Sequence, residues 1–296
     1  MILVTGSAGK TGRAVLRALL AKGETVRALV HRPDQIPAVQ SLGVQDALVG
    51  DMRNHSDMQP AFDRIRGVYH ICPNVSPAEI PIGQTVIAAA RSARVERFVF
   101  HSVLHPQIEA MPHHWNKLLV EQRLIESGLP FTILQPAVYM QNILARWQTI
   151  CDLGFFPVPY PAETRLSLVN LLDVAQVAAT VLTESGHANA TYELVGTPGL
   201  SQTEIAAILS TRTGRAVKVE VIPLPEWEKQ ARARGLGDYQ VQALARMFRY
   251  YRERGFSGNP QVLSWLLRRP PSTLENFIEE TIHQQQVLID HGMPGN

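Results

Sequence analysis

The strongest constraint on the fold lies at the amino terminus. Residues 1–5 are apolar and β-branched, which predicts a buried strand, and apolar residues recur at helical spacing over 12–22. Between these segments, Gly6, Gly9 and Gly12 stand in Gly-x-x-Gly-x-x-Gly spacing. The order strand, glycine turn, helix brings backbone N–H groups to the positive end of a helix dipole, an arrangement that binds phosphate.

Each glycine has its own steric reason. Gly6 permits a tight exit from the strand, Gly9 lacks a Cβ where a pyrophosphate would approach, and Gly12 lets the helix lie close to the sheet. The spacing differs from the usual dinucleotide fingerprint, so a plain strand-to-helix connection without a ligand stays an alternative. The other residues of this segment that we expect at a cofactor are Thr5, Ser7, Lys10 and Thr11.

Length and composition indicate a globular protein of one large domain or two unequal ones. The chain has 296 residues, 45% hydrophobic and 18% charged, with a formal net charge of +2. So small a charge favours neither nucleic acid nor a membrane surface as a partner. Two cysteines make no disulfide framework, and neither a signal peptide nor a bilayer-spanning run is visible, so we expect a cytoplasmic protein.

Strand and helix patterns alternate through the first half of the chain. Strands are predicted at residues 1–5, 25–30, 46–49, 67–72, 97–101 and 131–135, and helices near 12–22, 57–62, 79–93, 113–127 and 140–152. The strands are continuous apolar runs, which is typical of a parallel sheet covered on both faces. Repeated strand-helix units therefore predict a doubly wound α/β fold of the Rossmann type.

The pattern changes after residue 152. The expected elements are a proline-rich loop at 155–161, a helix at 170–183, a strand at 191–195, a helix at 202–213 opened by a capping box, and a strand at 217–222 before further helices.

These patterns predict two domains. We expect a dinucleotide-binding domain at 1–153, rejoined by about 166–197. A smaller, mainly helical substrate-binding domain is expected at 154–296, mostly 198–296.

The end of the second strand bears on which nucleotide binds. Proteins that bind NAD place a carboxylate there, and those that bind NADP place a cation for the 2′-phosphate. This strand ends in Val30-His31-Arg32-Pro33, and Arg32 is a bidentate phosphate donor. We therefore predict NADP(H) in preference to NAD(H), with a surface arginine that binds nothing as the alternative.

The next two strand ends also fit a cofactor. Asp51 is expected to accept a hydrogen bond from the adenine amino group while Met52 packs on the ring, although a turn aspartate is equally common without a ligand. The fourth strand runs into Cys72, Pro73 and Asn74, which would lie along the cofactor. Cys72 is interpreted as a small buried residue rather than a nucleophile, since no base is evident beside it.

Four histidines lie close together in the sequence, at His101, His105, His113 and His114. No His-Glu-x-x-His motif and no cysteine pair at ligand spacing accompanies them, so we predict no metal site. His113 and Lys117 are four residues apart in a predicted helix and therefore share one face.

Together these motifs resemble the NmrA-like branch of the atypical short-chain dehydrogenases, whose enzymes are of the quinone oxidoreductase and triphenylmethane reductase type. The resemblance covers residues 1 to about 225 and continues weakly at 265–271. Its motifs are the glycine turn, Gly50-Asp51-Met52, His101-Ser102-Val103-Leu104-His105-Pro106, His113-x-x-x-Lys117 and Leu134-Gln135-Pro136-Ala137-Val138-Tyr139-Met140-Gln141-Asn142.

The resemblance implies NAD(P)(H) along the carboxyl edge of the sheet, in a cleft between two domains. The glycine turn would hold the pyrophosphate and Arg32 the 2′-phosphate. Lys117 would reach the nicotinamide ribose, with Pro136 and Ala137 beside the nicotinamide. The candidate catalytic residues are Lys117, His113, Ser102, Tyr139 and Asn142.

One departure from the family pattern limits the chemistry. The classical relatives use Tyr-x-x-x-Lys with the tyrosine as general acid, and this chain has His113 in that place. A reduced ketone is a strongly basic alkoxide, so the loss of the acid would cost roughly 10²–10⁴-fold. A reduced quinone resembles a phenolate, whose conjugate acid has a pKa of about 10. The motif therefore favours easily reduced aromatic acceptors such as quinones, azo compounds and dyes.

The sequence leaves one other function open and speaks against another. Some relatives sense the NADP redox state and bind a protein partner without chemistry, and this alternative stays open. The arginines and aromatic residues of 227–254 could suggest nucleic-acid binding, but acidic residues interrupt them. We therefore expect a small aromatic substrate, no nucleic-acid or membrane partner, and a monomer or homodimer.

Overall fold

A computed structural model describes residues 1–290, which group into two compact units. Unit 1 comprises residues 1–136, 171–194 and 238–244, and unit 2 comprises the rest of the described chain. None of the described helices is both long and apolar enough to cross a membrane.

Unit 1 is built on a seven-stranded sheet in which every neighbouring pair of strands is parallel. The strands in spatial order are β11 (Ala190–Leu194), β6 (Phe131–Pro136), β5 (Arg97–His101), β4 (Gly67–His70), β1 (Ile2–Val4), β2 (Val26–Val30) and β3 (Asp46–Val49). The order reverses direction between β1 and β4, which makes their carboxyl ends the topological switch point where α/β folds bind ligands.

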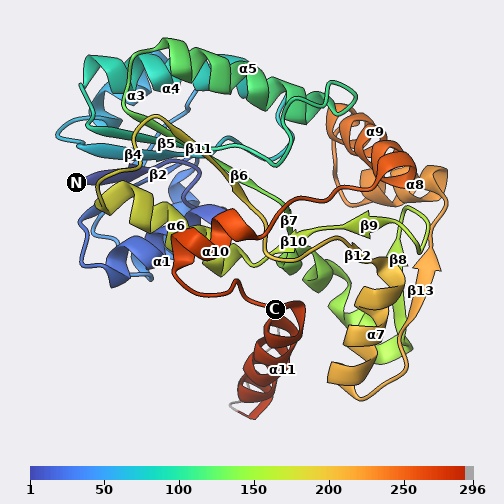
Figure 1. The fold of residues 1–296 in the computed structure, drawn as a ribbon. Coiled ribbons are helices and arrows are strands. Elements are labelled where there is room, and N and C mark those ends of the chain that lie inside the picture. Colours follow the sequence, from blue (N-terminus) through green and yellow to red (C-terminus); the bar gives the residue numbers. More distant parts are fainter. Residues whose placement is uncertain (291–296) are drawn as a thin grey trace. The chain divides into compact units, whose positions relative to one another are not determined.

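Helices cover both faces of this sheet (Figure 1). They are α1 (Lys10–Ala21), η1 (Pro33–Gln35), α2 (Ile36–Gln40), α3 (His55–Ala61), α4 (Glu79–Ser92), α5 (Pro112–Glu126) and α6 (Leu171–Thr183). On one face, Val86 and Ala90 of α4 and Val120 of α5 join Phe98 and Ile133 of the sheet in one buried cluster. β1 and β2 are buried along their whole length, as expected for strands covered on both faces.

Unit 2 is mainly helical and has its own core. Its elements are β7 (Val138–Tyr139), η2 (Met140–Arg146), η3 (Thr149–Leu153), β8 (Phe155–Val158), β9 (Arg165–Leu166), β10 (Leu168–Val169), β12 (Leu200–Ser201), α7 (Gln202–Thr213), β13 (Lys218–Val221), α8 (Leu224–Ala233), α10 (Gln261–Leu267) and α11 (Leu274–Asp290). Trp147, Phe156, Leu209 and Ile278 lie in its buried cluster. Helix α9 (Asp238–Arg254) has its first seven residues in unit 1 and the others in unit 2.

The structure confirms the doubly wound α/β fold and most of the predicted elements. β3, β5 and α7 have the predicted bounds, and Ser201 and Glu204 form the predicted capping box. Two predictions were wrong. Residues 155–158 form β8, because their backbone pairs in parallel with β13 despite Pro157. The helix expected at 140–152 divides into a 3₁₀ segment, η2, and a π-helical segment, η3.

The glycine turn is held by close backbone contacts. Gly6 has a φ of +58°, in the left-handed region that favours glycine. A Cβ added at Gly12 would lie 2.4 Å from the carbonyl oxygen of Gly6 and 2.7 Å from the Cα of Ser7. Gly12 is therefore required because α1 packs tightly against the turn that precedes it. The atoms that exclude a side chain here belong to that turn and not, as predicted, to the sheet.

We expect Gly12→Ala to lower the free energy of unfolding by about 1–3 kcal/mol, the scale of overpacking, although alanine is the better helix former. Chemical denaturation measures the change. Gly9→Ala is the control, because its Cβ would lie 3.3 Å from the Gly6 oxygen and should cost less than about 1 kcal/mol. Equal stability of the Gly12 variant and the wild type would contradict the packing argument.

Candidate active site

The first turn of α1 presents backbone N–H donors at the carboxyl edge of the sheet. Gly9 is the N-cap, no side chain caps the helix, and its first turn holds no acidic residue. First-turn amides lack intrahelical acceptors, so they are available to an anion. A Cβ at Gly9 would meet only the Gly6 oxygen within 4 Å, which leaves its other sides open for a ligand.

Thr5 and Ser7 shape this turn from inside, and both side chains are fully buried. The Thr5 hydroxyl lies 3.0 Å from Nδ1 of His70, donates to the Ile71 carbonyl at 3.1 Å and accepts from the Ile71 N–H at 3.0 Å. The Ser7 hydroxyl donates to the Val4 carbonyl at 2.5 Å. Both hydroxyls are thus engaged in hydrogen bonds with the backbone at the strand ends. They would influence a ligand site through its shape.

Arg32 and Asp51 each have an ionic partner nearby in the sequence. Arg32 donates to both carboxylate oxygens of Asp34, at 3.0 and 3.2 Å, and both side chains are exposed. Asp51 accepts from the Arg53 guanidinium, with a shortest distance of 2.6 Å. That hydrogen bond lowers the pKa of Asp51 to about 2, so its carboxylate is ionised at neutral pH.

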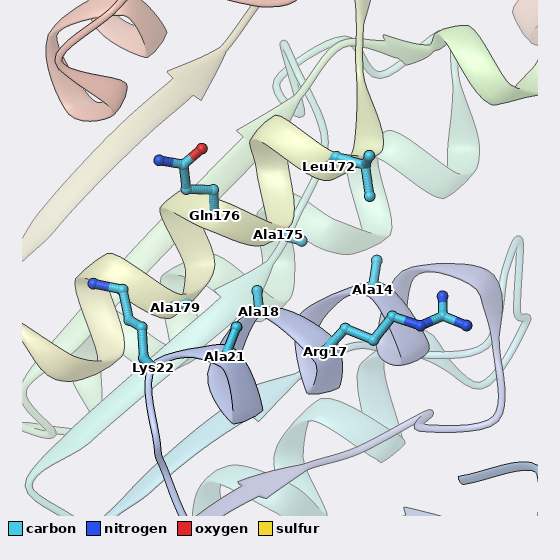
Figure 2. Close-up of a pocket in the computed structure, with 9 residues that line it drawn as sticks. All are labelled: Ala14, Arg17, Ala18, Ala21, Lys22, Leu172, Ala175, Gln176 and Ala179. Carbon is cyan, nitrogen blue, oxygen red and sulfur yellow. The ribbon is translucent and has the colours of Figure 1, made fainter. Parts of the chain in front are cut away.

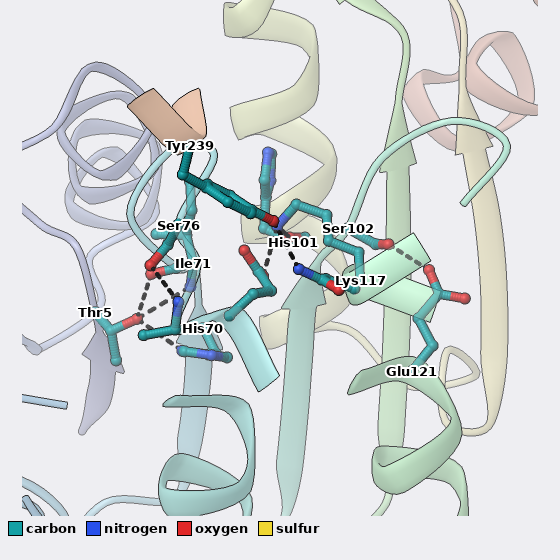
Figure 3. Close-up of polar contacts among 12 residues, drawn as sticks. Thr5, His70, Ile71, Ser76, His101, Ser102, Lys117, Glu121 and Tyr239 are labelled. Atoms are coloured by element: carbon teal, nitrogen blue, oxygen red, sulfur yellow. Dashed lines mark hydrogen bonds and ion pairs between the residues drawn. The ribbon is translucent and has the colours of Figure 1, made fainter. Parts of the chain in front are cut away.

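Lys117 pairs with a buried carboxylate that sequence reasoning missed. Its Nζ donates to Oε1 of Glu79 at 2.8 Å and to the His101 carbonyl at 3.4 Å (Figure 3). Glu79 opens α4 and is 2% exposed. An ammonium has three N–H donors. Lys117 uses two of them in its hydrogen bonds with the described residues, which leaves one N–H for a ligand. Burial and the charge of Glu79 raise the pKa of the Cys72 thiol, which supports its interpretation as a non-nucleophile.

Ser102 belongs to a second buried polar group. Its hydroxyl donates to Oε1 of Glu121, and Nε2 of Gln135 donates to both Glu121 oxygens at 3.0 and 3.1 Å. Burial raises the pKa of Glu121. Glu121 lies four residues after Lys117 in α5, so the two share one helix face. That spacing is the one sequence signal from which Glu121 could have been predicted as part of the site. The Ser102 hydroxyl is thus a donor to Glu121 in this structure.

His113 is held in its neutral form. Burial, with a smaller effect of Lys117, lowers its pKa to about 4, and its Nδ1 has no partner among the described residues. Burial also lowers the pKa values of the more deeply buried His70 and His101, to about 3. A neutral imidazole is a weak acid at neutral pH, so His113 is poorly suited to protonate a strongly basic product.

Tyr239, at the start of α9, also lies in this part of unit 1. Nδ2 of Asn116, the residue before Lys117, donates to its phenolic oxygen at 3.0 Å (Figure 3). No motif spacing connects position 239 with α5, so the sequence carried no signal for this contact.

The remaining predicted site residues divide between the two units. Thr11 and Met52 lie in unit 1, where the partly buried Met52 packs against the buried cluster, and Pro73 and Asn74 are exposed after β4. Lys10 is exposed at the start of α1, and Pro136 ends β6. Ala137, Tyr139 and Asn142 belong to unit 2.

A groove elsewhere in unit 1 contains none of these residues (Figure 2). It lies between α1 and α6, and small side chains make up most of it. Its lining is Ala14, Arg17, Ala18, Ala21, Lys22, Leu172, Ala175, Gln176 and Ala179.

Comparison with known proteins identifies the family. Residues 1–286 match the sequence model of the NmrA-like family. NAD(P)H azoreductase from Xenophilus azovorans is 30% identical, with 94% of this chain and 96% of that protein covered. Quinone oxidoreductase 2 from Escherichia coli is 26% identical, with 94% and 97% covered. These matches confirm the resemblance inferred from the motifs.

A solved structure has the same fold. The Citrobacter sp. triphenylmethane reductase complexed with NADP(H) superposes with a TM-score of 0.83 at 23% identity, over 95% of this chain and 99% of that one.

The neutral state of His113 predicts a pH effect on stability. Its pKa falls from 6.5 unfolded to about 4 folded. Below pH 6.5 His113 therefore binds a proton in the unfolded chain but stays neutral in the folded one. The unfolded chain is favoured, so the free energy of unfolding decreases as the pH falls from 6.5 towards 4. From pH 6.5 to pH 5 the free energy of unfolding should decrease in both proteins. The decrease should be roughly 1–2 kcal/mol smaller in His113→Gln than in the wild type.

Urea denaturation at both pH values measures this difference. The surface variant His55→Gln should follow the wild type, because its side chain is exposed. Identical pH dependence in His113→Gln and the wild type would show that folding does not lower the pKa of His113.

Proposed function

The chain belongs to the NmrA-like family, and from this premise we propose that it is an NADPH-dependent reductase of easily reduced aromatic acceptors. It is an oxidoreductase of the atypical short-chain dehydrogenase type, as its named homologues are. The azoreductase and the quinone oxidoreductase support azo compounds and quinones as the acceptor classes. Both relatives are enzymes, and nothing in the described residues favours a regulatory protein without chemistry.

One observation carries the proposal: Lys117 and the uncapped start of α1 lie at the same edge of one parallel sheet. The α1 amides and the open side of Gly9 suit a pyrophosphate, and the third donor of Lys117 suits a ribose hydroxyl. These residues fit a nicotinamide dinucleotide. When bound, it would supply the hydride.

The protein's own residues would orient the cofactor, and His113 would not need to act as a strong acid. The Glu79 carboxylate fixes Lys117 in place, because a buried ammonium without a counter-charge would be strongly unfavourable. A quinone reduced to a phenolate-like anion needs no strong acid, which agrees with a neutral imidazole at position 113.

Arg32 supports a preference for NADPH over NADH. Its guanidinium is exposed, forked and one strand away from the glycine turn, so a 2′-phosphate would compete with Asp34 for it. The cytoplasmic location, the monomeric or homodimeric state and the lack of a nucleic-acid partner stay predictions from the sequence.

We expect NADPH to bind more tightly than NADH, and Arg32→Ala to narrow the difference by roughly tenfold, the scale of one charge-assisted hydrogen bond. Isothermal calorimetry with both nucleotides measures it. Asp34→Asn is the matched variant: it removes the competing carboxylate and should widen the preference for NADPH. Equal affinity of the wild type for the two nucleotides would rule out the role of Arg32.

Lys117→Met should raise the KM for NADPH and lower turnover in NADPH-linked quinone reduction. Because the single change leaves Glu79 buried without its cation, the double variant Lys117→Met/Glu79→Gln tests the same loss without that imbalance. His113→Ala should be milder. A loss above about a thousandfold in His113→Ala would make the histidine a general acid instead. Tight NADPH binding without turnover on quinones, azo compounds or dyes would overturn the proposed reductase.

A further inference from the structure

Tyr239 brings a phenol from a distant part of the chain to Asn116, the residue before Lys117. The amide of Asn116 donates to its oxygen at 3.0 Å, so the phenolic proton is directed elsewhere. Tyr239 makes no second hydrogen bond among the described residues. Figure 3 shows the ring extending from α9 toward Lys117. The site therefore contains a phenol whose proton is available, although the sequence lacks Tyr-x-x-x-Lys.

The surroundings of this phenol also link it to Lys117. Partial burial raises the pKa of Tyr239, the Asn116 hydrogen bond opposes that shift, and the charge of Glu79 raises the pKa again. Glu79 is the same carboxylate that holds Lys117. The phenol thus keeps its proton at neutral pH, and it shares its electrostatic environment with the lysine expected to hold the reacting end of the cofactor.

We propose that Tyr239 is the proton donor of this site and that it equips the enzyme for azo compounds, whose reduced anions are strongly basic. The inference rests on the proposed reductase function. Asn116 acts as a positioning residue, because its amide fixes the phenolic oxygen and leaves the proton pointing to the acceptor.

The acceptor class follows from the balance of the step. An azo N=N bond gains a hydride at one nitrogen from NADPH, which becomes NADP⁺, and the electron pair of the broken π bond moves to the other nitrogen. That nitrogen takes the Tyr239 proton, the tyrosinate takes a proton from water, and the product is a hydrazine. The nitrogen anion is far more basic than a phenolate, so azo reduction requires the acid and quinone reduction does not.

The test compares two acceptors in one variant. For Tyr239→Phe we expect kcat with an azobenzene dye to fall by about 10²–10⁴-fold, and kcat with a naphthoquinone to fall by less than about tenfold. Calorimetry should give an unchanged Kd for NADPH. Tyr250→Phe, the same change on the same helix, should leave both reactions and the Kd unchanged. Asn116→Ala should lower azo reduction more than quinone reduction.

The outcomes separate this inference from the proposed function. Equal losses with both acceptors, or a weakened Kd for NADPH, would show that Tyr239 only holds the start of α9 in place. Undiminished azo reduction in Tyr239→Phe would overturn its role while leaving the reductase intact. A wild type that reduces quinones but no azo compound would also overturn the inference alone, and a wild type that oxidises NADPH with neither would overturn both.

Discussion

Parallel pairing in the sheet of unit 1 determines where the strand-end groups of the candidate site lie. Because all seven strands run the same way, the segments after β1, β4 and β5 leave at one edge. Thr5, Ile71 and Ser102 therefore come from distant positions to one side of the sheet. The close approach of α1 to the Gly6 turn completes this edge, since any side chain at position 12 would displace the helix.

Buried charge is the second organising feature of the site. Lys117 and Glu79 compensate each other, and Glu121 is satisfied by Ser102 and Gln135. Each carboxylate is tolerable in a low-dielectric interior only because its partner is in place. Burial instead keeps His101 and His113 neutral by lowering their pKa values. Of these buried side chains, Lys117 is the one that keeps a positive charge, because Glu79 compensates it.

Most of unit 1 could be predicted because its strands are short, apolar and separated by turn residues, which is a local signal. β3 and β5 agree with their predicted bounds. Unit 2 was harder, because β8 is a strand only through its pairing with β13, about 60 residues away. The aromatic and proline content of 155–158 carried no trace of that partner.

Local patterning in the chain determined the glycine turn, the parallel sheet, the basic residue after β2 and the shared helix face of His113 and Lys117. Each depends on residues within a few positions of one another. Only the tertiary structure decided that Glu79 neutralises Lys117, that Glu121 accepts a hydrogen bond from the Ser102 hydroxyl, and that Tyr239 brings a phenol to Asn116. These contacts join segments 19 to 123 residues apart, and no spacing rule connects such segments before the chain is folded.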